Sequence, residues 1–98
     1  MIKSAIIATA FLSLTAVASA QEYAKFNGCP YRSIEGCILI RGPNGQIYNI
    51  SAANPLPRIG YLGILGGGKV TDHVSFCLQG RVLENIKYHY TRLRCKAS

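Results

Sequence analysis

The four cysteines are the side chains of this sequence with the widest range of possible chemistry, and they lie far apart along the chain. They are Cys29, Cys37, Cys77 and Cys95. No C-x-x-C pair is present, and His73 and His89 do not complete a clustered set of ligands, so the spacing indicates no zinc site. Scattered cysteines in an exported chain form disulfides. We therefore predict two disulfides, no metal and no cofactor.

Acidic and histidine side chains give little support to catalysis. An enzyme would need a nucleophile with a base, or paired carboxylates. Asp72 and His73 are adjacent, and neighbours in an extended chain point to opposite faces. The segment Gly63–Lys69 has the G-x-x-x-x-G-K spacing of a phosphate-binding loop, but Val70 stands where a Ser or Thr would bind Mg²⁺. We expect a protein that is not an enzyme.

Positive charge is the stronger functional indication. Without the first 20 residues, which include Lys3, the chain has 11 − 1 = 10 lysines and arginines against 4 acids, a formal charge of +6. The run Tyr88–Arg94 (YHYTRLR) interleaves aromatic and cationic side chains. Such surfaces bind nucleic acid, anionic lipid headgroups or acidic glycans. The same charge also keeps a small exported domain in solution, so both interpretations stay open.

The first 20 residues have the pattern of a secretory signal peptide. Lys3 precedes an apolar stretch, Ala5–Val17, and the small residues Ala18-Ser19-Ala20 follow. The stretch is too short for a transmembrane helix. The sequence therefore predicts cleavage after Ala20, a mature chain that begins at Gln21 without a transmembrane segment, and a periplasmic or secreted location.

The remaining 98 − 20 = 78 residues are enough for one small domain stabilised by disulfides. Short β-branched and aromatic runs predict strands at Cys37–Arg41, Gln46–Ser51, Ile59–Leu65, Val70–Leu78 and Arg81–Leu93. The first two should form a hairpin across Gly42–Gly45 (GPNG). Gly66–Lys69 is predicted to be a flexible tip. The segment 21–33 is predicted to be an N-terminal arm, and 34–98 the domain with its C-terminal tail.

Five short strands with closely spaced turns predict an all-β barrel or sandwich, and their arrangement resembles an OB-fold, a five-stranded Greek-key barrel. Three motifs are similar to those of a family of small exported bacterial proteins with an OB-fold-like domain and no assigned activity. They are Glu35–Ile40 (EGCILI), Gly45–Ile50 (GQIYNI) and Cys77–Gly80 (CLQG). The resemblance implies a small five-stranded OB-like Greek-key barrel, and it implies no function. The chain departs from the family in its Gln21–Ile34 arm and in the tail that ends at Cys95, each of which adds one cysteine, so we predict disulfide-tied terminal arms.

Ligands of OB-folds usually lie on the face of strands 2 and 3, beside the loops that join strands 1–2 and 4–5. On this chain that face would carry Tyr48, Arg58 and Tyr61, with Arg41 and Arg81 near the loops. Tyrosine offers a stacking surface and arginine a charge for anionic groups. Alternatively, Tyr48 and Tyr61 fill the core.

The predicted function is a binding module for an acidic glycan, a nucleic acid or an envelope component. A structural or protein-interaction domain of the envelope is the alternative, and a small secreted enzyme is the third hypothesis. The sequence sets no oligomeric state.

The OB-like topology also implies a disulfide pairing. It places the first strand beside the fourth, which brings Cys37 close to Cys77 and leaves Cys29 to pair with Cys95. The rival pairing, Cys29–Cys37 with Cys77–Cys95, is favoured by short sequence separation and stays open.

Overall fold

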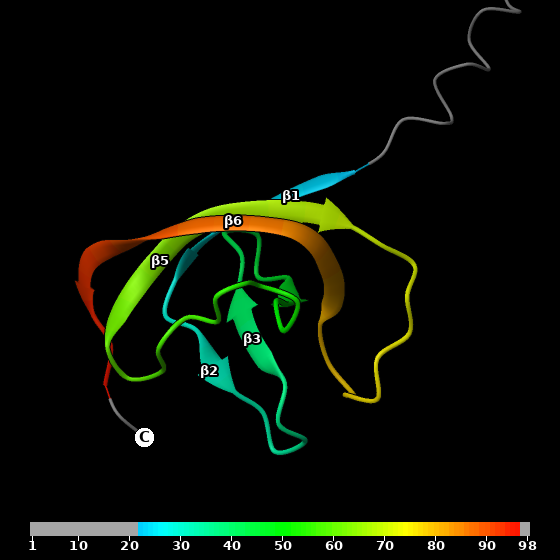
Figure 1. The fold of residues 1–98 in the computed structure, drawn as a ribbon, viewed down its shortest axis with the longest axis horizontal. Coiled ribbons are helices and arrows are strands. Elements are labelled where there is room, and N and C mark those ends of the chain that lie inside the picture. The colour runs from blue at the N-terminus through cyan, green and yellow to red at the C-terminus, as the bar shows by residue number, and fades with distance from the viewer. Residues whose placement is uncertain (1–21, 97–98) are drawn as a thin grey trace, which may run out of the picture.

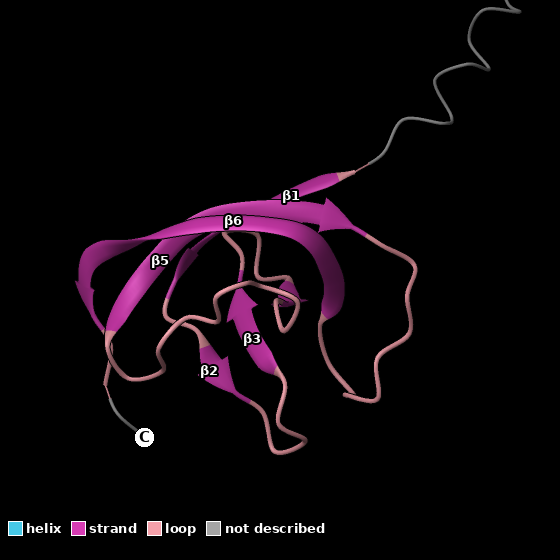
Figure 2. Cartoon of the chain, in the orientation of Figure 1, coloured by secondary structure: helices cyan, strands magenta, loops and turns pink. Residues whose placement is uncertain are grey.

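The computed structural model describes residues 22–96, and all regular structure in this range is β-strand (Figures 1 and 2). The strands are β1 (Tyr23–Gly28), β2 (Tyr31–Arg32), β3 (Ile38–Arg41), β4 (Ile47–Asn49), β5 (Leu62–Val70) and β6 (Arg81–Arg94). They form one mixed sheet in the order β1-β5-β6-β4-β3-β2, in which only β4 and β6 pair in parallel. The all-β prediction is confirmed. The predicted signal peptide lies outside the described residues.

The two longest strands, β5 and β6, form a curved arch over the shorter strands (Figure 1). Three glycines, Gly66, Gly67 and Gly68, lie inside β5. A Cβ atom at Gly66 would overlap the carbonyl oxygen of Lys87, and one at Gly67 would lie 2.6 Å from the carbonyl oxygen of Ala24. The glycines therefore let β1 and β6 pack closely on both sides of β5. The prediction of a flexible tip at Gly66–Lys69 is wrong, because this segment lies inside β5. Glycine has no side chain, and here that allows the neighbouring strands to approach closely.

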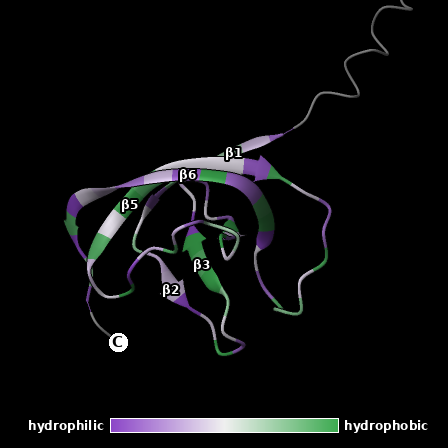
Figure 3. Ribbon diagram, in the orientation of Figure 1, coloured by the Kyte–Doolittle hydropathy of each residue, from purple (hydrophilic) through white to green (hydrophobic). Residues whose placement is uncertain are grey.

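The core has two parts, one on each face of β3. The main cluster contains Ala24, Phe26, Ile38, Ile40, Tyr48, Ile50, Ile64 and Leu83. Leu39 belongs instead to a second cluster with Cys37 and Cys77. Successive side chains of a strand point to opposite faces. Because a cluster covers each face of β3, Ile38, Leu39 and Ile40 are all buried. Figure 3 shows most of β3 in the green of hydrophobic residues.

Two sequence predictions about strands are confirmed and two are wrong. The hairpin across Gly42–Gly45 is present as the pair β3–β4, and β6 matches its predicted range closely. The third strand is shifted from Ile59–Leu65 to Leu62–Val70. The predicted fourth strand, Val70–Leu78, is a loop beyond its first residue. Its alternating pattern is real, but the apolar side chains point outward, so no strand partner covers them.

The segment predicted to be an N-terminal arm supplies two strands instead. β1 and β2 form the two edges of the sheet, and Ala24 and Phe26 on β1 are in the main core. The sequence argument paired the first predicted strand, which is β3, with the fourth. This pairing is wrong, because β3 lies between β2 and β4. β1 is the strand that pairs with β5. Residues 22–96 contain six strands where five were predicted, and the hydrogen-bonded sheet that they form is not closed.

The disulfides are Cys29–Cys95 and Cys37–Cys77, with Cα–Cα distances of 5.7 and 6.5 Å. These are the pairs that the sequence argument preferred, although the strand pairing behind that argument does not occur. Cys37 precedes β3, and Cys77 lies in the β5–β6 loop. Two disulfides are typical of an oxidising, non-cytoplasmic environment. Among the described residues, no helix is long and apolar enough to cross a membrane.

Candidate functional site

The five candidate binding residues do not gather at one place. Tyr48 is 8% exposed and belongs to the main core, as the alternative interpretation of this residue had it. Arg41 is exposed at the end of β3. Arg81, at the start of β6, forms an ion pair with Glu22 (3.4 Å). Tyr48 and Arg81 are register partners on β4 and β6, but the Tyr48 side chain is buried in the core. Arg58 and Tyr61 are the two candidates whose exposed side chains are in contact.

Arg58 is held over the ring of Tyr61. Its guanidinium carbon is 4.5 Å from the ring centroid, the geometry of a cation–π contact. Arg58 is exposed, and no ion pair or side-chain hydrogen bond within residues 22–96 uses its guanidinium group. The five N–H donors of this group are thus positioned and free to bind an anion.

Two further tyrosines join this pair. Tyr61 packs edge to face on Tyr90 (5.3 Å between centroids), and Tyr90 packs in the same way on Tyr88 (5.9 Å). Tyr61 and Tyr90 remain 43% and 37% exposed. We call Arg58, Tyr61, Tyr88 and Tyr90 the tyrosine cluster.

Two hydroxyl groups fix the position of the cluster relative to the preceding loop. The backbone amide of Arg58 donates to Oη of Tyr90 (2.9 Å), and Oη of Tyr88 donates to the carbonyl oxygen of Pro55 (2.8 Å). Burial raises the pKa of Tyr88, and the neighbouring Tyr90 adds to this shift. Tyr88 therefore stays neutral and keeps its proton for the bond to Pro55.

A shallow groove of about 510 Å³ adjoins the tyrosine cluster. Its lining residues are Asn54, Pro55, Ile86, Lys87, Tyr88, His89 and Tyr90. None of them is acidic. The amide of Cys95 donates to the carbonyl oxygen of Tyr61 (3.0 Å). Arg94 and Lys96 are the chain neighbours of Cys95, so their backbone lies near the cluster.

Sequence reasoning singled out the Tyr88–Arg94 run but did not include Tyr88 and Tyr90 among the candidate residues. The sequence did indicate that Tyr88 and Tyr90 lie on the same face, because residues two apart on a strand share a face. What the sequence could not show is that Arg58 and Tyr61, from the loop before β5, lie against that face.

The acids are concentrated at the other end of β5. Glu22, Asp72 and Glu84 line one groove together with Lys69, His73 and Arg81. Nδ1 of His73 is 2.8 Å from Oε2 of Glu84. Charges of both signs meet in this groove, whereas no ion pair within residues 22–96 involves a cation near the tyrosine cluster. In the part of the chain that is described, no group of three or more His, Cys, Asp and Glu side chains could hold a metal ion.

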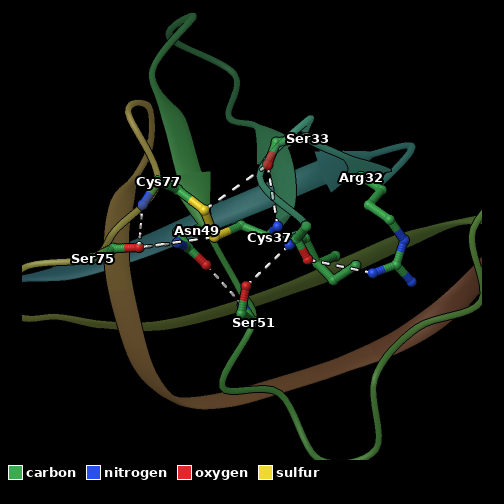
Figure 4. The surroundings of a disulfide bond; sticks show 9 residues. Arg32, Ser33, Cys37, Asn49, Ser51, Ser75 and Cys77 are labelled. Atoms are coloured by element: carbon green, nitrogen blue, oxygen red, sulfur yellow. Dashed lines mark hydrogen bonds between the residues drawn. A yellow bond between two sulfur atoms is a disulfide. The ribbon is translucent and has the colours of Figure 1, made fainter.

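Beside the Cys37–Cys77 disulfide, Asn49 is the one buried polar residue recorded among residues 22–96 (Figure 4). Its Nδ2 donates to Oγ of Ser75 (3.2 Å), and its Oδ1 accepts from the amide of Ser51 (3.0 Å). Oγ of Ser75 also accepts from the amide of Cys77 (3.1 Å). This network attaches the β5–β6 loop to β4, and sequence reasoning gave Asn49 no such role.

No family model, curated protein or solved structure matches this chain.

Proposed function

We propose that this protein is a small exported OB-like β-barrel domain that binds an anionic ligand at the tyrosine cluster. The observation that carries the proposal is the exposed guanidinium of Arg58, stacked on Tyr61 beside a groove that contains Lys87 and no acid. A guanidinium group binds carboxylate, phosphate or sulfate through two parallel hydrogen bonds. Binding rather than catalysis is proposed, because the cluster offers a cation and aromatic rings but no nucleophile with a base.

The OB-like barrel is supported by the position of β1 and β2. These edge strands are consecutive in the chain, with only Cys29 and Pro30 between them. If Tyr23–Arg32 is one bent strand, five strands remain and the same strand occupies both edges, as a closed barrel requires. The carbonyl oxygen of Lys25 on β1 is 3.4 Å from the position of a Cβ atom at Gly42, so β1 passes close to the end of β3.

The surroundings of Arg58 favour an anionic polymer with rings in its repeating unit, such as an acidic glycan or a single-stranded nucleic acid. The edges and faces of Tyr61 and Tyr90 that remain exposed can contact a sugar or a base. Lys87 and His89 line the adjoining groove and can contact a second charged unit of such a polymer.

A periplasmic or secreted location is part of this proposal. The signal-peptide pattern of Met1–Ala20 and the two disulfides support it. Its test is the intact mass of the protein from its native host. A mass that retains residues 1–20 would contradict export by cleavage.

The binding test is a titration with two labelled probes, a sulfated oligosaccharide and a single-stranded oligonucleotide, at low and at physiological salt. We expect Arg58→Ala to weaken binding of the preferred probe by about tenfold or more, because a charge-assisted hydrogen bond is lost. Tyr61→Ala should also weaken binding while the fold is retained.

Arg41→Ala is the matched control, because it removes the same charge from an exposed site outside the cluster. Its affinity should remain close to that of the wild type. Equal losses in Arg58→Ala and Arg41→Ala, both abolished by salt, would show a non-specific charge effect and would refute the site.

A further inference from the structure

Four large apolar side chains at the β5–β6 loop end of the molecule are almost fully exposed. They are Ile34 (103%), Val74 (95%), Leu78 (90%) and Phe76 (79%). Ile34 comes from the β2–β3 turn, and the other three come from the loop of residues 71–80, which is yellow in Figure 1. We call these four residues the apolar loop surface. Grouped exposed apolar residues mark interaction sites in soluble proteins.

The outward display of this surface is fixed by side-chain bonds. Within the described residues, no backbone–backbone hydrogen bond outside the strands involves residues 72–80. The loop is held instead by the Cys37–Cys77 disulfide and by the bond from Asn49 to Ser75. Ser75 and Cys77 alternate with Val74, Phe76 and Leu78, so the polar and bonded positions face the protein and the apolar positions face solvent.

The two loops that carry the surface are also bonded to each other. The pKa of the exposed Glu35 carboxyl is lowered by hydrogen bonds with its own backbone, with Ser33 and with the backbone of Leu78. Oγ of Ser33 in the β2–β3 turn also lies 3.9 Å from Sγ of Cys77 in the β5–β6 loop, so the two loops are in direct contact.

Hollows lie directly beside the exposed side chains. One, of about 350 Å³, is lined in part by Val74, Phe76 and Val82. Another, of about 400 Å³, is lined in part by Ile34, Leu39 and Leu78. Apolar side chains that project next to hollows lined in part by apolar side chains are self-complementary, as a twofold interface between identical chains requires.

The distribution of charge also favours contact between two identical chains at this end of the molecule. The grooves at this end contain all four acids of the sequence, Glu22, Glu35, Asp72 and Glu84, and only three lysines and arginines, Arg32, Lys69 and Arg81. The other 10 − 3 = 7 cations of residues 21–98 lie elsewhere. Two copies would repel through their basic parts, but their nearly neutral loop ends can meet.

We propose that the apolar loop surface docks against the same surface of a second copy of this chain, in a twofold-symmetric dimer. The inference is independent of the proposed ligand. A lipid bilayer is a poorer occupant, because the carboxylates of Glu35 and Asp72 adjoin the apolar residues and would resist entry into the membrane. In the dimer both tyrosine clusters face away from the interface, so a polymer could bind to two sites at once.

The test is the mass of the processed protein, residues 21–98, by light scattering and sedimentation equilibrium over about two decades of micromolar concentration. We expect a concentration-dependent dimer that persists in high salt, because apolar burial drives its formation. The variant Phe76→Ser/Leu78→Ser should be monomeric throughout this range, with both disulfides intact. Leu56→Ser, which changes another exposed apolar residue, should still dimerise.

A wild-type monomer at every concentration would overturn the proposal, and so would a dimer that survives in Phe76→Ser/Leu78→Ser. Flotation with vesicles of phosphatidylglycerol and phosphatidylethanolamine is the parallel measurement. Vesicle binding by a monomeric wild type, lost in the double variant, would assign the surface to lipid and overturn the dimer.

Discussion

The tyrosine cluster and the apolar loop surface lie at opposite ends of β5, and they are held in place by different forces. Tyr61 precedes β5, and Tyr88 and Tyr90 project from β6, so the cluster rests on the backbone ladder between the two longest strands. The loop of residues 71–80 follows β5 and depends on a disulfide and on the side chain of Asn49.

The two ends also differ in charge. The cations near the tyrosine cluster have no acidic neighbours in the adjoining groove, whereas every acid of the sequence lies in the grooves of the loop end. The same small domain therefore presents one end suited to an anion and another suited to a protein surface. It follows that backbone changes in β5 should damage the first end most, and loss of the Cys37–Cys77 disulfide the second.

The largest expected effect tests the backbone ladder. A Cβ atom at Gly66 would overlap the carbonyl oxygen of Lys87 and lie 2.7 Å from Cα of Tyr88, and backbone atoms cannot move aside without separating β5 from β6. We expect Gly66→Ala to lose more than about 3 kcal/mol, enough to unfold a domain of this size. Urea denaturation followed by circular dichroism is the measurement.

Gly28→Ala is the control, because its new Cβ atom would meet nothing within 4 Å. It should differ from the wild type by less than about 0.5 kcal/mol. If Gly66→Ala proved as stable as Gly28→Ala, the close packing of β5 would not be what supports the tyrosine end.

The sequence could predict local structure, such as the Gly42–Gly45 turn and the apolar run of β3, because a few neighbouring residues decide it. It could not predict the strand through Gly66–Gly68, since glycine indicates flexibility until the adjacent strands are known. Val70–Leu78 alternates apolar and polar residues as a strand does, but the sequence could not show that the segment is a loop. Ser75 and Cys77 face inward only through partners that are distant in sequence.

The same limit applied to the candidate site. The pairing of Arg58 with Tyr61 lies within four residues and was accessible to sequence reasoning. The contact of Tyr61 with Tyr90 joins residues 29 positions apart (90 − 61), so only the register of β5 with β6 reveals it.

The second prediction separates the two ends. Cys37→Ser/Cys77→Ser removes a cross-link between residues 40 positions apart, and the chain-entropy argument gives a loss of about 4 kcal/mol or less. We expect two hydrogen-bonded amides of the β5–β6 loop, at residues 73 and 77, to exchange hydrogen faster and the dimer to weaken. Where the variant remains folded, binding at the tyrosine cluster should change little.

Cys29→Ser/Cys95→Ser is the matched comparison, because it removes the other disulfide, which lies beside the tyrosine end. Its loop amides should exchange as in the wild type. Equal acceleration of the amides at residues 73 and 77 in both double variants would mean that the loop is not held locally by its own disulfide.

The smallest effect concerns the hydroxyl of Tyr88. Tyr88→Phe loses the hydrogen bond to the carbonyl oxygen of Pro55 (2.8 Å) and should cost about 1 kcal/mol at neutral pH. Tyr23→Phe, which changes a tyrosine that is 60% exposed, should cost less.

The pH dependence of stability identifies the same hydroxyl, because burial raises the pKa of Tyr88 above its ordinary value of 10.0. Below that value Tyr88 is neutral in the folded and the unfolded chain, so it adds no pH dependence there. As the pH rises past 10.0, the unfolded chain loses this proton first, and the free energy of unfolding falls until the folded form ionises too. The wild type should therefore lose stability in this window faster than Tyr88→Phe, as measured by thermal melting at a series of alkaline pH values. Parallel losses in the two proteins would show that the hydroxyl of Tyr88 is not protected within the cluster, and that the loop before β5 is held there by ring packing alone.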